Sequence, residues 1–111
     1  MLANHGFKDG KVNGKVTENQ CRSGPLSGLR IVEMSGKGPA PFCGMMLSDM
    51  GADVVRIDRV AVSAQRYEHY VDPLSRGRRS VAVDLKTSAG VSTVRRLAAS
   101  ADGLIEGYRP G

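Results

Sequence analysis

The sequence predicts an α/β protein built on a Rossmann-like parallel sheet unit. Three observations lead to this class. An apolar run of strand length leads through a glycine turn into a helix-length segment, a second apolar run follows that segment, and the order of strand and helix then occurs again. So compact a strand–helix–strand unit implies parallel strands joined by a right-handed crossover. With 111 residues, the chain has room for one small domain.

The first strand is predicted over residues 29–34, because this short apolar run fits a strand that is buried on both faces. Gly36 and Gly38 then allow a sharp turn, since neither residue carries a Cβ atom. Pro39 and Pro41 favour the start of a helix, because the N–H that proline lacks would be unpaired in the first helical turn anyway.

This first helix is predicted to carry an apolar face, because Phe42, Met46 and Met50 recur at spacings of four residues. We assign the methionines of the helix to packing and not to chemistry. Gly51 is expected to end the helix, as a glycine just past the last turn commonly does. The second strand is then predicted over residues 52–57.

The second half of the chain begins after a surface excursion, predicted over residues 60–75 and turned by an Asp-Pro step. The third strand is predicted over residues 80–85 and the fourth over residues 102–108. Thr87 or Ser88 can cap the helix between them by accepting a hydrogen bond from a backbone N–H. That helix has an apolar stripe, formed by Val91, Val94, Leu97, Ala98 and Ala101. Two helices are thin cover for four strands, so we expect the sheet unit to be incomplete.

Composition excludes several classes of protein. With 41% apolar and 24% charged residues, the chain is neither disordered nor membrane-spanning, and it has no secretory signal core. Residues 1–24 are polar and aperiodic, so we interpret them as a mobile N-terminal extension. Cys21 and Cys43 make no disulfide framework and are expected to be reduced. His5 and His69 have no neighbouring ligand residues, so no metal site is predicted.

The net charge of +5 has one local concentration, at Arg76, Arg78 and Arg79. A basic cluster suggests an anionic partner, for which phosphate groups are the simplest choice, and a solvated basic loop is the alternative. Nucleic-acid binding is not predicted, because only 5% of residues are aromatic and no nucleic-acid module is present.

The glycine turn also leaves a nicotinamide dinucleotide site open as an alternative. Gly36 and Gly38 match the start of that fingerprint, but Pro41 stands where its third glycine belongs. Asp58 lies near the end of the second strand, where an acid would meet a ribose. Otherwise Asp58 and Glu33 are interpreted as acids at strand ends or turns.

Three sequence segments occur in a characteristic order. They are PLSGLRIVEMSGKGPAPFCGMMLSDMGADVVRIDR from residue 25, SRGRRSVAVDLKTSAG from residue 75 and DGLIEGYRPG from residue 102. Together they resemble the N-terminal segment of the family III coenzyme A transferases, and in particular its α-methylacyl-CoA racemase branch. The sequence around Glu106 and Tyr108 resembles that of the racemases more than that of the transferases, which have asparagine and phenylalanine there.

The resemblance implies that residues 25–111 form the N-terminal part of a CoA-binding Rossmann-like domain. The implied contacts with coenzyme A are Lys37, Arg59, Val83, Lys86, Gly107, Tyr108 and Arg109. Lys37 departs from the aliphatic residue that the family usually has near the adenine. Arg59 and Lys86 suit phosphate chemically, since arginine forms bidentate contacts and lysine acts as a point charge. The structural alternatives are a solvated strand end for Arg59, a surface lysine for Lys86 and a half-buried strand tyrosine for Tyr108.

The resemblance also implies an activity. It suggests part of an acyl-CoA racemase, with a family III CoA transferase or a non-catalytic CoA- or nucleotide-binding module as alternatives. In the family, the residues that transfer protons or act as nucleophile lie beyond the matched region, so no catalytic residue is predicted and an N-terminal fragment is expected. The acyl-CoA thioester is the substrate, and no further cofactor or metal is implied. The implied assembly is an interlocked homodimer in the cytoplasm, or in mitochondria or peroxisomes of a eukaryote.

Overall fold

The computed structural model describes residues 23–60 and 72–109, which fold into one α/β layer structure. The elements follow in the order β1 (Arg30–Met34), α1 (Pro39–Asp49), β2 (Asp53–Arg59), η1 (Pro73–Ser75), β3 (Arg79–Val83), α3 (Ser88–Ala99) and β4 (Gly103–Ile105). The predicted fold class, an α/β protein with a parallel sheet, is confirmed.

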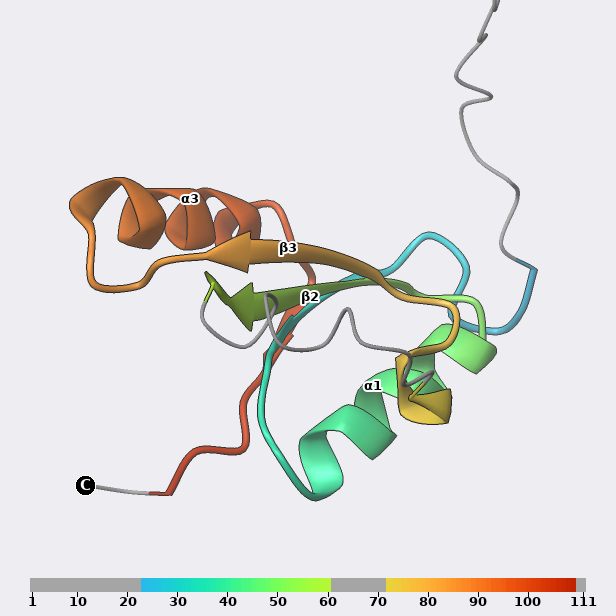
Figure 1. Ribbon diagram of the computed structural model, residues 1–111. Coiled ribbons are helices and arrows are strands. Elements are labelled where there is room, and N and C mark those ends of the chain that lie inside the picture. Colours follow the sequence, from blue (N-terminus) through green and yellow to red (C-terminus); the bar gives the residue numbers. More distant parts are fainter. Residues whose placement is uncertain (1–22, 61–71, 110–111) are drawn as a thin grey trace, which may run out of the picture.

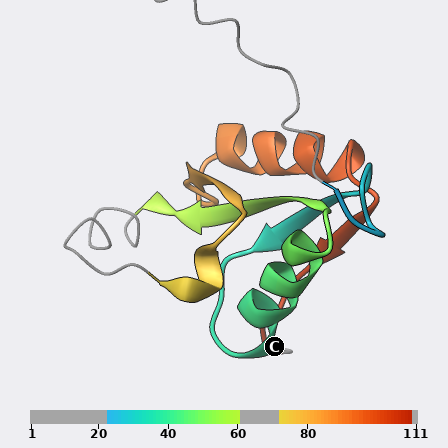
Figure 2. The ribbon, with the colours of Figure 1, turned by 90° about the vertical axis from the view of Figure 1, so that its right-hand side faces the viewer.

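The four strands of the described residues form one parallel sheet in the order β3-β2-β1-β4. Helix α3 covers one face of this sheet and α1 covers the opposite face (Figure 1; Figure 2). Strands β1 and β2 therefore lie in the middle, and their residues alternate between the two helices. All four strands end at the same edge of the sheet, because they run in the same direction.

The face beneath α3 carries the hydrophobic core. Val32, Ile57 and Val83 come from three different strands and are almost completely buried. The partly buried residues packed against them are Met34, Val81, Val94, Leu97 and Ala101. The apolar stripe predicted for the second helix is thus confirmed for Val94 and Leu97, and Ala101 packs with them from just beyond the helix. Burial of this kind stabilises the fold by roughly 25 cal/mol for each Å² of apolar surface removed from water.

Helix α1 packs through a different set of residues than the sequence predicts. Phe42 is 51% exposed and Met46 is 46% exposed, so the prediction that Met46 packs inside is wrong. The buried residues of the helix are mostly small ones, Ala40, Pro41, Gly44, Met45 and Ser48. The physical reason lies under the helix: a Cβ atom on Gly44 would collide with the carboxylate of Glu33, so only glycine allows this close approach.

Four charged side chains lie beneath α1, from Glu33, Arg56, Asp58 and Arg78, and we call them the buried charge cluster. Arg78 donates to the Glu33 carboxylate, and these two side chains are 1% and 0% exposed. Arg56 Nε lies 3.1 Å from Asp58 Oδ1. Of the two settings predicted for Glu33, the turn is wrong: Glu33 lies near the end of β1, as the strand-end alternative predicts, but it is completely buried.

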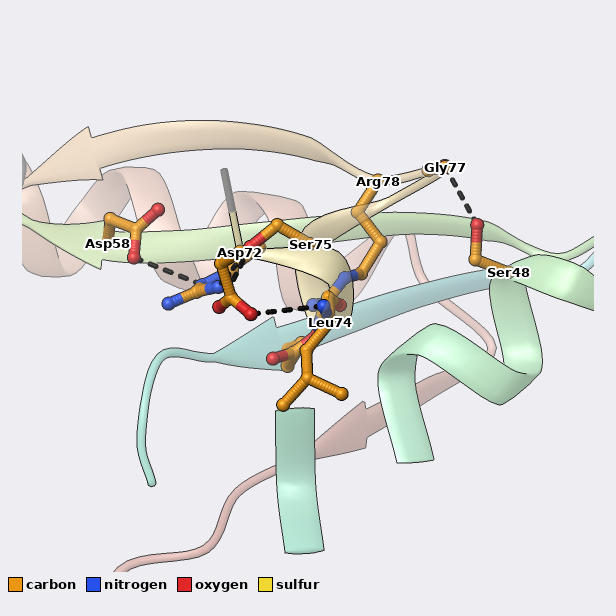
Figure 3. Close-up of polar contacts among 9 residues, drawn as sticks. Ser48, Asp58, Asp72, Leu74, Ser75, Gly77 and Arg78 are labelled. Atoms are coloured by element: carbon orange, nitrogen blue, oxygen red, sulfur yellow. Dashed lines mark hydrogen bonds and ion pairs between the residues drawn. The ribbon is translucent and has the colours of Figure 1, made fainter. Parts of the chain in front are cut away.

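The connection into β3 is held by the same region. Arg56 Nη1 donates to Ser75 Oγ at 3.1 Å, and Arg78 donates to the carbonyl of Leu74. Ser48 Oγ, on α1, donates to the carbonyl of Gly77 at 2.8 Å (Figure 3). The short helix η1 is thereby fixed against both α1 and β2.

Most element ends follow the local signals with small shifts, but β4 ends at Ile105, three residues before its predicted end. Helix α1 ends at Asp49, two residues before Gly51, the predicted stop, and Thr87 caps α3 by accepting from Gly90 N at 3.0 Å. Strand β2 continues two residues beyond its predicted end, to Arg59, whereas β3 stops at Val83. The predicted N-terminal extension lies outside the described residues as far as residue 22, and most of the predicted surface excursion, residues 61–71, lies outside them as well.

Candidate functional site

The carboxyl ends of the strands bring most of the predicted site residues to one edge of the sheet, which we call the carboxyl edge. Arg59 is the last residue of β2, and its register partner Val83 is the last residue of β3. Lys37 follows the end of β1, and Tyr108 follows the end of β4. Ligands of open α/β sheets bind outside this edge.

Arg59 and Tyr108 are in direct contact at the carboxyl edge. The guanidinium carbon of Arg59 lies 5.7 Å from the centre of the Tyr108 ring, within the range of a cation–π interaction. The hydroxyl of Tyr108 donates to the carbonyl of Ser35 at 3.1 Å. Ser35 N in turn donates to the carbonyl of Ile57 at 2.9 Å, so the contact joins the ends of three strands.

Among the described residues, the positive charges at this edge are not compensated by carboxylates. Within residues 23–60 and 72–109, no ion pair links Arg59, Lys37 or Lys86 to a carboxylate. All three residues are exposed. The arrangement can therefore attract an anion without first breaking an internal ion pair.

The glycine before Tyr108 lets the chain pass close to the start of α1. A Cβ atom on Gly107 would lie 3.1 Å from the Cβ atom of Ala40, which is tighter than ordinary van der Waals contact. Gly107 thus lies beside the first turn of α1, next to the glycine turn that contains Lys37. Arg109 follows in the same exposed segment.

Two other predicted site residues, Val83 and Lys86, do not take part in the contact between Arg59 and Tyr108. Val83 is only 7% exposed and belongs to the hydrophobic core, so its side chain is not available at the edge. Lys86 is exposed in the turn that leads into α3, where its backbone N donates to Asp84 Oδ1 at 2.9 Å. The structure brings Lys86 to the same edge as Arg59, but through a separate loop.

The arginines predicted as a phosphate site lie elsewhere and are neutralised. They are at the opposite, amino edge, where β3 begins. Arg76 Nη2 lies 2.6 Å from Asp49 Oδ2, and Arg79 Nη2 lies 2.6 Å from Asp53 Oδ2. Hydrogen bonding and charge from Arg76 hold the pKa of Asp49 below its ordinary value. Arg78 is buried against Glu33, so the three arginines do not form one solvated cluster. Arg76 and Arg79 remain exposed, as the solvated-loop alternative predicts, although each is paired with a carboxylate. Binding of an anion by these two arginines stays a prediction.

The dinucleotide alternative loses its acidic residue. Asp58 pairs with Arg56 in the buried charge cluster, and its side chain is only 14% exposed. A carboxylate held in this way is poorly placed to accept hydrogen bonds from a ribose at the sheet edge.

Sequence reasoning missed two residues that shape this region. The carbonyl of Ser35 carries the contact with Tyr108, and a backbone carbonyl leaves no signature in a sequence. Arg56 is 3% exposed, although its place in an alternating strand resembles that of a solvent-facing residue. One signal in the sequence could have found the cluster: both central strands carry a charged residue within an apolar run. These residues, Glu33 and Arg56, are register partners in the sheet.

Within residues 23–60 and 72–109, no group of three or more histidine, cysteine, aspartate or glutamate residues could hold a metal ion. None of the helices described there has the length and apolarity needed to cross a membrane. Cys43, on α1, is exposed and forms no disulfide bond.

A family model and the sequences of known proteins place this chain in the same protein family. The model of CoA-transferase family III matches residues 26–111. Alpha-methylacyl-CoA racemase of Mus musculus is 48% identical over 86 residues, which are 78% of this chain and 21% of that protein. Succinate–glutarate CoA-transferase of Agrobacterium fabrum is 34% identical over 110 residues, covering 85% of this chain and 28% of that protein.

Solved structures agree with these relatives. The orthorhombic crystal structure of Rv3272 from Mycobacterium tuberculosis superposes with a TM-score of 0.71 at 36% identity, covering 81% of this chain and 26% of that one. This chain thus spans only about a fifth to a quarter of the length of such relatives. Since the family model covers every element from β1 to β4, the chain belongs to CoA-transferase family III.

Proposed function

We propose that this chain is the coenzyme A-binding portion of an acyl-CoA racemase, which epimerises the carbon next to the thioester carbonyl. The observation that carries the proposal is the uncompensated guanidinium of Arg59, which lies against Tyr108 at the carboxyl edge. Coenzyme A carries several phosphate charges, and arginine binds phosphate through paired, charge-assisted hydrogen bonds. Lys37 and Lys86 add positive charge at the same edge.

The family relationship supports racemisation over transfer. The murine racemase is 48% identical, whereas the bacterial transferase is 34% identical. Racemisation needs a base and an acid on opposite faces of the α-carbon, together with stabilisation of an enolate. We assign binding to the described residues and assign none of them to proton transfer. The acyl-CoA thioester is the proposed substrate, and the proposal includes no further cofactor.

The binding assignment is tested by calorimetric titration of the 111-residue chain with coenzyme A. We expect Arg59→Ala to weaken binding by about tenfold or more, because a hydrogen bond to a charged group contributes about 1.5–3 kcal/mol. Arg95→Ala is the matched control, since it removes the same charge from an exposed position in the middle of α3. Equal affinity of the Arg59 variant and the wild-type chain would remove Arg59 from the site.

A second candidate is a CoA transferase that moves coenzyme A between carboxylic acids, favoured by the match to the Agrobacterium enzyme over most of this chain. The two reactions differ in a simple way. Incubation of the whole enzyme of which this chain is proposed to be a portion, with a 2-methylacyl-CoA in deuterated water, should place deuterium on the α-carbon with no acceptor acid present. A new thioester that forms only after succinate is added would instead identify a transferase. Binding of coenzyme A with neither product would leave a non-catalytic binding module.

A further inference from the structure

We propose that Tyr108 is a positioning residue, which holds the Arg59 guanidinium and the β1–α1 turn in one fixed arrangement before coenzyme A arrives. This inference rests on the proposed function, because coenzyme A is the ligand whose phosphates Arg59 would meet. It adds a role for the phenol of Tyr108, whose ring and hydroxyl act on different parts of the site.

The contacts of Tyr108 form a closed ring of interactions that begins and ends on β2. Its ring lies under the Arg59 guanidinium, and its hydroxyl donates to the carbonyl of Ser35. Ser35 N donates to the carbonyl of Ile57, which precedes Arg59 by two residues on β2. The contacts therefore lead from Arg59 on β2 through Tyr108 and Ser35 back to β2, and each contact restrains the position of the residues that it joins.

The hydroxyl is needed because the ladder of strand hydrogen bonds does not reach Tyr108. The register of β4 with β1 ends where Ile105 faces Glu33, three residues earlier. Beyond that point, Tyr108 N bonds only locally, to Glu106 Oε2 at 2.9 Å. Among the described residues, the hydroxyl of Tyr108 makes the one hydrogen bond that ties this terminal segment to another element.

The ring supports Arg59 without cancelling its charge. A carboxylate at this position would neutralise the guanidinium, as carboxylates do for Arg76 and Arg79 at the amino edge. An aromatic face instead limits the rotamers of the arginine and leaves its N–H groups available for phosphate. Ordering a long side chain in advance reduces the entropy that is lost when the ligand binds.

The test is a double-mutant cycle on coenzyme A affinity, measured by titration of the 111-residue chain at several salt concentrations. The variants are Arg59→Ala, Tyr108→Ala and the two together, with Tyr108→Phe as the conservative variant. We expect Tyr108→Ala to weaken binding by about tenfold, and the double variant to bind no worse than Arg59→Ala alone. Tyr108→Phe keeps the ring and should weaken binding only about fivefold, the equivalent of one neutral hydrogen bond.

Salt dependence separates positioning from a merely structural role. Loss of a phosphate contact flattens the decline of affinity with salt, so Tyr108→Ala should flatten it as Arg59→Ala does. Tyr108→Phe should keep the wild-type salt dependence. Effects of Arg59→Ala and Tyr108→Ala that simply multiply, or an unchanged salt dependence in Tyr108→Ala, would overturn the proposal.

The outcomes also separate this proposal from the proposed function. Wild-type binding that Arg59→Ala weakens and Arg95→Ala does not, together with full affinity of both Tyr108 variants, would overturn the positioning role alone. A wild-type chain that does not bind coenzyme A would overturn both. If Tyr108→Ala fails to fold, Tyr108→Phe decides the question through its affinity: a loss of about fivefold supports the proposal, and wild-type affinity overturns it.

Discussion

Arginines at the two edges of the sheet occupy opposite electrostatic settings. At the amino edge, Arg76 and Arg79 each have a carboxylate oxygen within 2.6 Å. At the carboxyl edge, Arg59 lies against an aromatic ring and forms no ion pair with the described residues. The same side chain is therefore paired with a carboxylate at one edge and remains available for a ligand at the other. The difference teaches that compensation of charge, more than its local density, distinguishes a binding edge from a structural one.

The buried charge cluster between the two edges gives the largest test of this distinction. Arg78→Ala should destabilise the chain by about 3–5 kcal/mol, because it leaves the Glu33 carboxylate buried without its partner. Urea denaturation at neutral pH measures this loss. A loss below 1 kcal/mol would show that water reaches Glu33 and that the cluster is not truly interior.

A control replaces both partners. Glu33→Leu combined with Arg78→Met removes two buried charges together, and such exchanges are often neutral or stabilising. We therefore expect the double variant to recover most of the stability that Arg78→Ala loses. The recovery would assign the loss to the orphaned carboxylate and not to missing packing.

A carboxylate at the carboxyl edge should make that edge resemble the amino edge. Tyr108→Glu places an acid beside Arg59, and we expect coenzyme A affinity to fall by about tenfold or more relative to Tyr108→Gln. The glutamine variant has the same shape without the charge, so the ratio isolates the ion pair. Titration of both variants measures it, and equal affinities would contradict the role given to uncompensated charge.

Arg79→Ala is the reciprocal test at the amino edge. Its partner Asp53 is partly exposed and also lies 3.4 Å from Arg30, so we expect a stability loss of about 0–1 kcal/mol. Coenzyme A affinity should stay at the wild-type value, whereas Arg59→Ala should show the reverse pattern. A tenfold loss of affinity in Arg79→Ala would mean that the ligand reaches the amino edge.

The smallest expected effect concerns pH. Hydrogen bonding and charge from Arg76 lower the pKa of Asp49 in the folded chain. The stabilisation is therefore complete above the unfolded pKa, about 3.9 for aspartate, and is lost as the pH falls through the lower folded value. Urea denaturation of wild type and Asp49→Asn should give a difference at pH 6 that disappears in strong acid. A difference that is constant with pH would assign the effect to something other than this ion pair.

Local signals predicted the order of elements and therefore the carboxyl edge. Apolar runs, the glycine turn and the cap at Thr87 fixed strands and helices to within a few residues. Parallel pairing then requires Arg59 and Tyr108 to meet at the same end of the sheet. Neither inference needs knowledge of tertiary contacts, which is why both could be made from the sequence.

Compensation of charge could not be predicted in the same way. Arg78 pairs with Glu33, which is 45 residues away in the sequence, and Arg79 pairs with Asp53, which is 26 residues away. A sequence shows three neighbouring arginines as a basic cluster, but their partners are brought to them by the fold. The exposure of Met46 has the same origin, because the charged layer beneath α1 admits only the small face of that helix.

The place of β4 in the sheet has a consequence for synthesis of the chain. Strand β1 pairs with β4, and Arg30 N donates to Asp102 Oδ2 across a separation of 72 residues. A ribosome adding roughly 5–20 residues per second needs about 4–14 s to supply that partner. During this interval β1 presents one unpaired edge, and unpaired edges recruit other chains. The speed of translation thus governs how long a nascent chain is exposed to misassembly, and pairing across so long a separation slows folding as well.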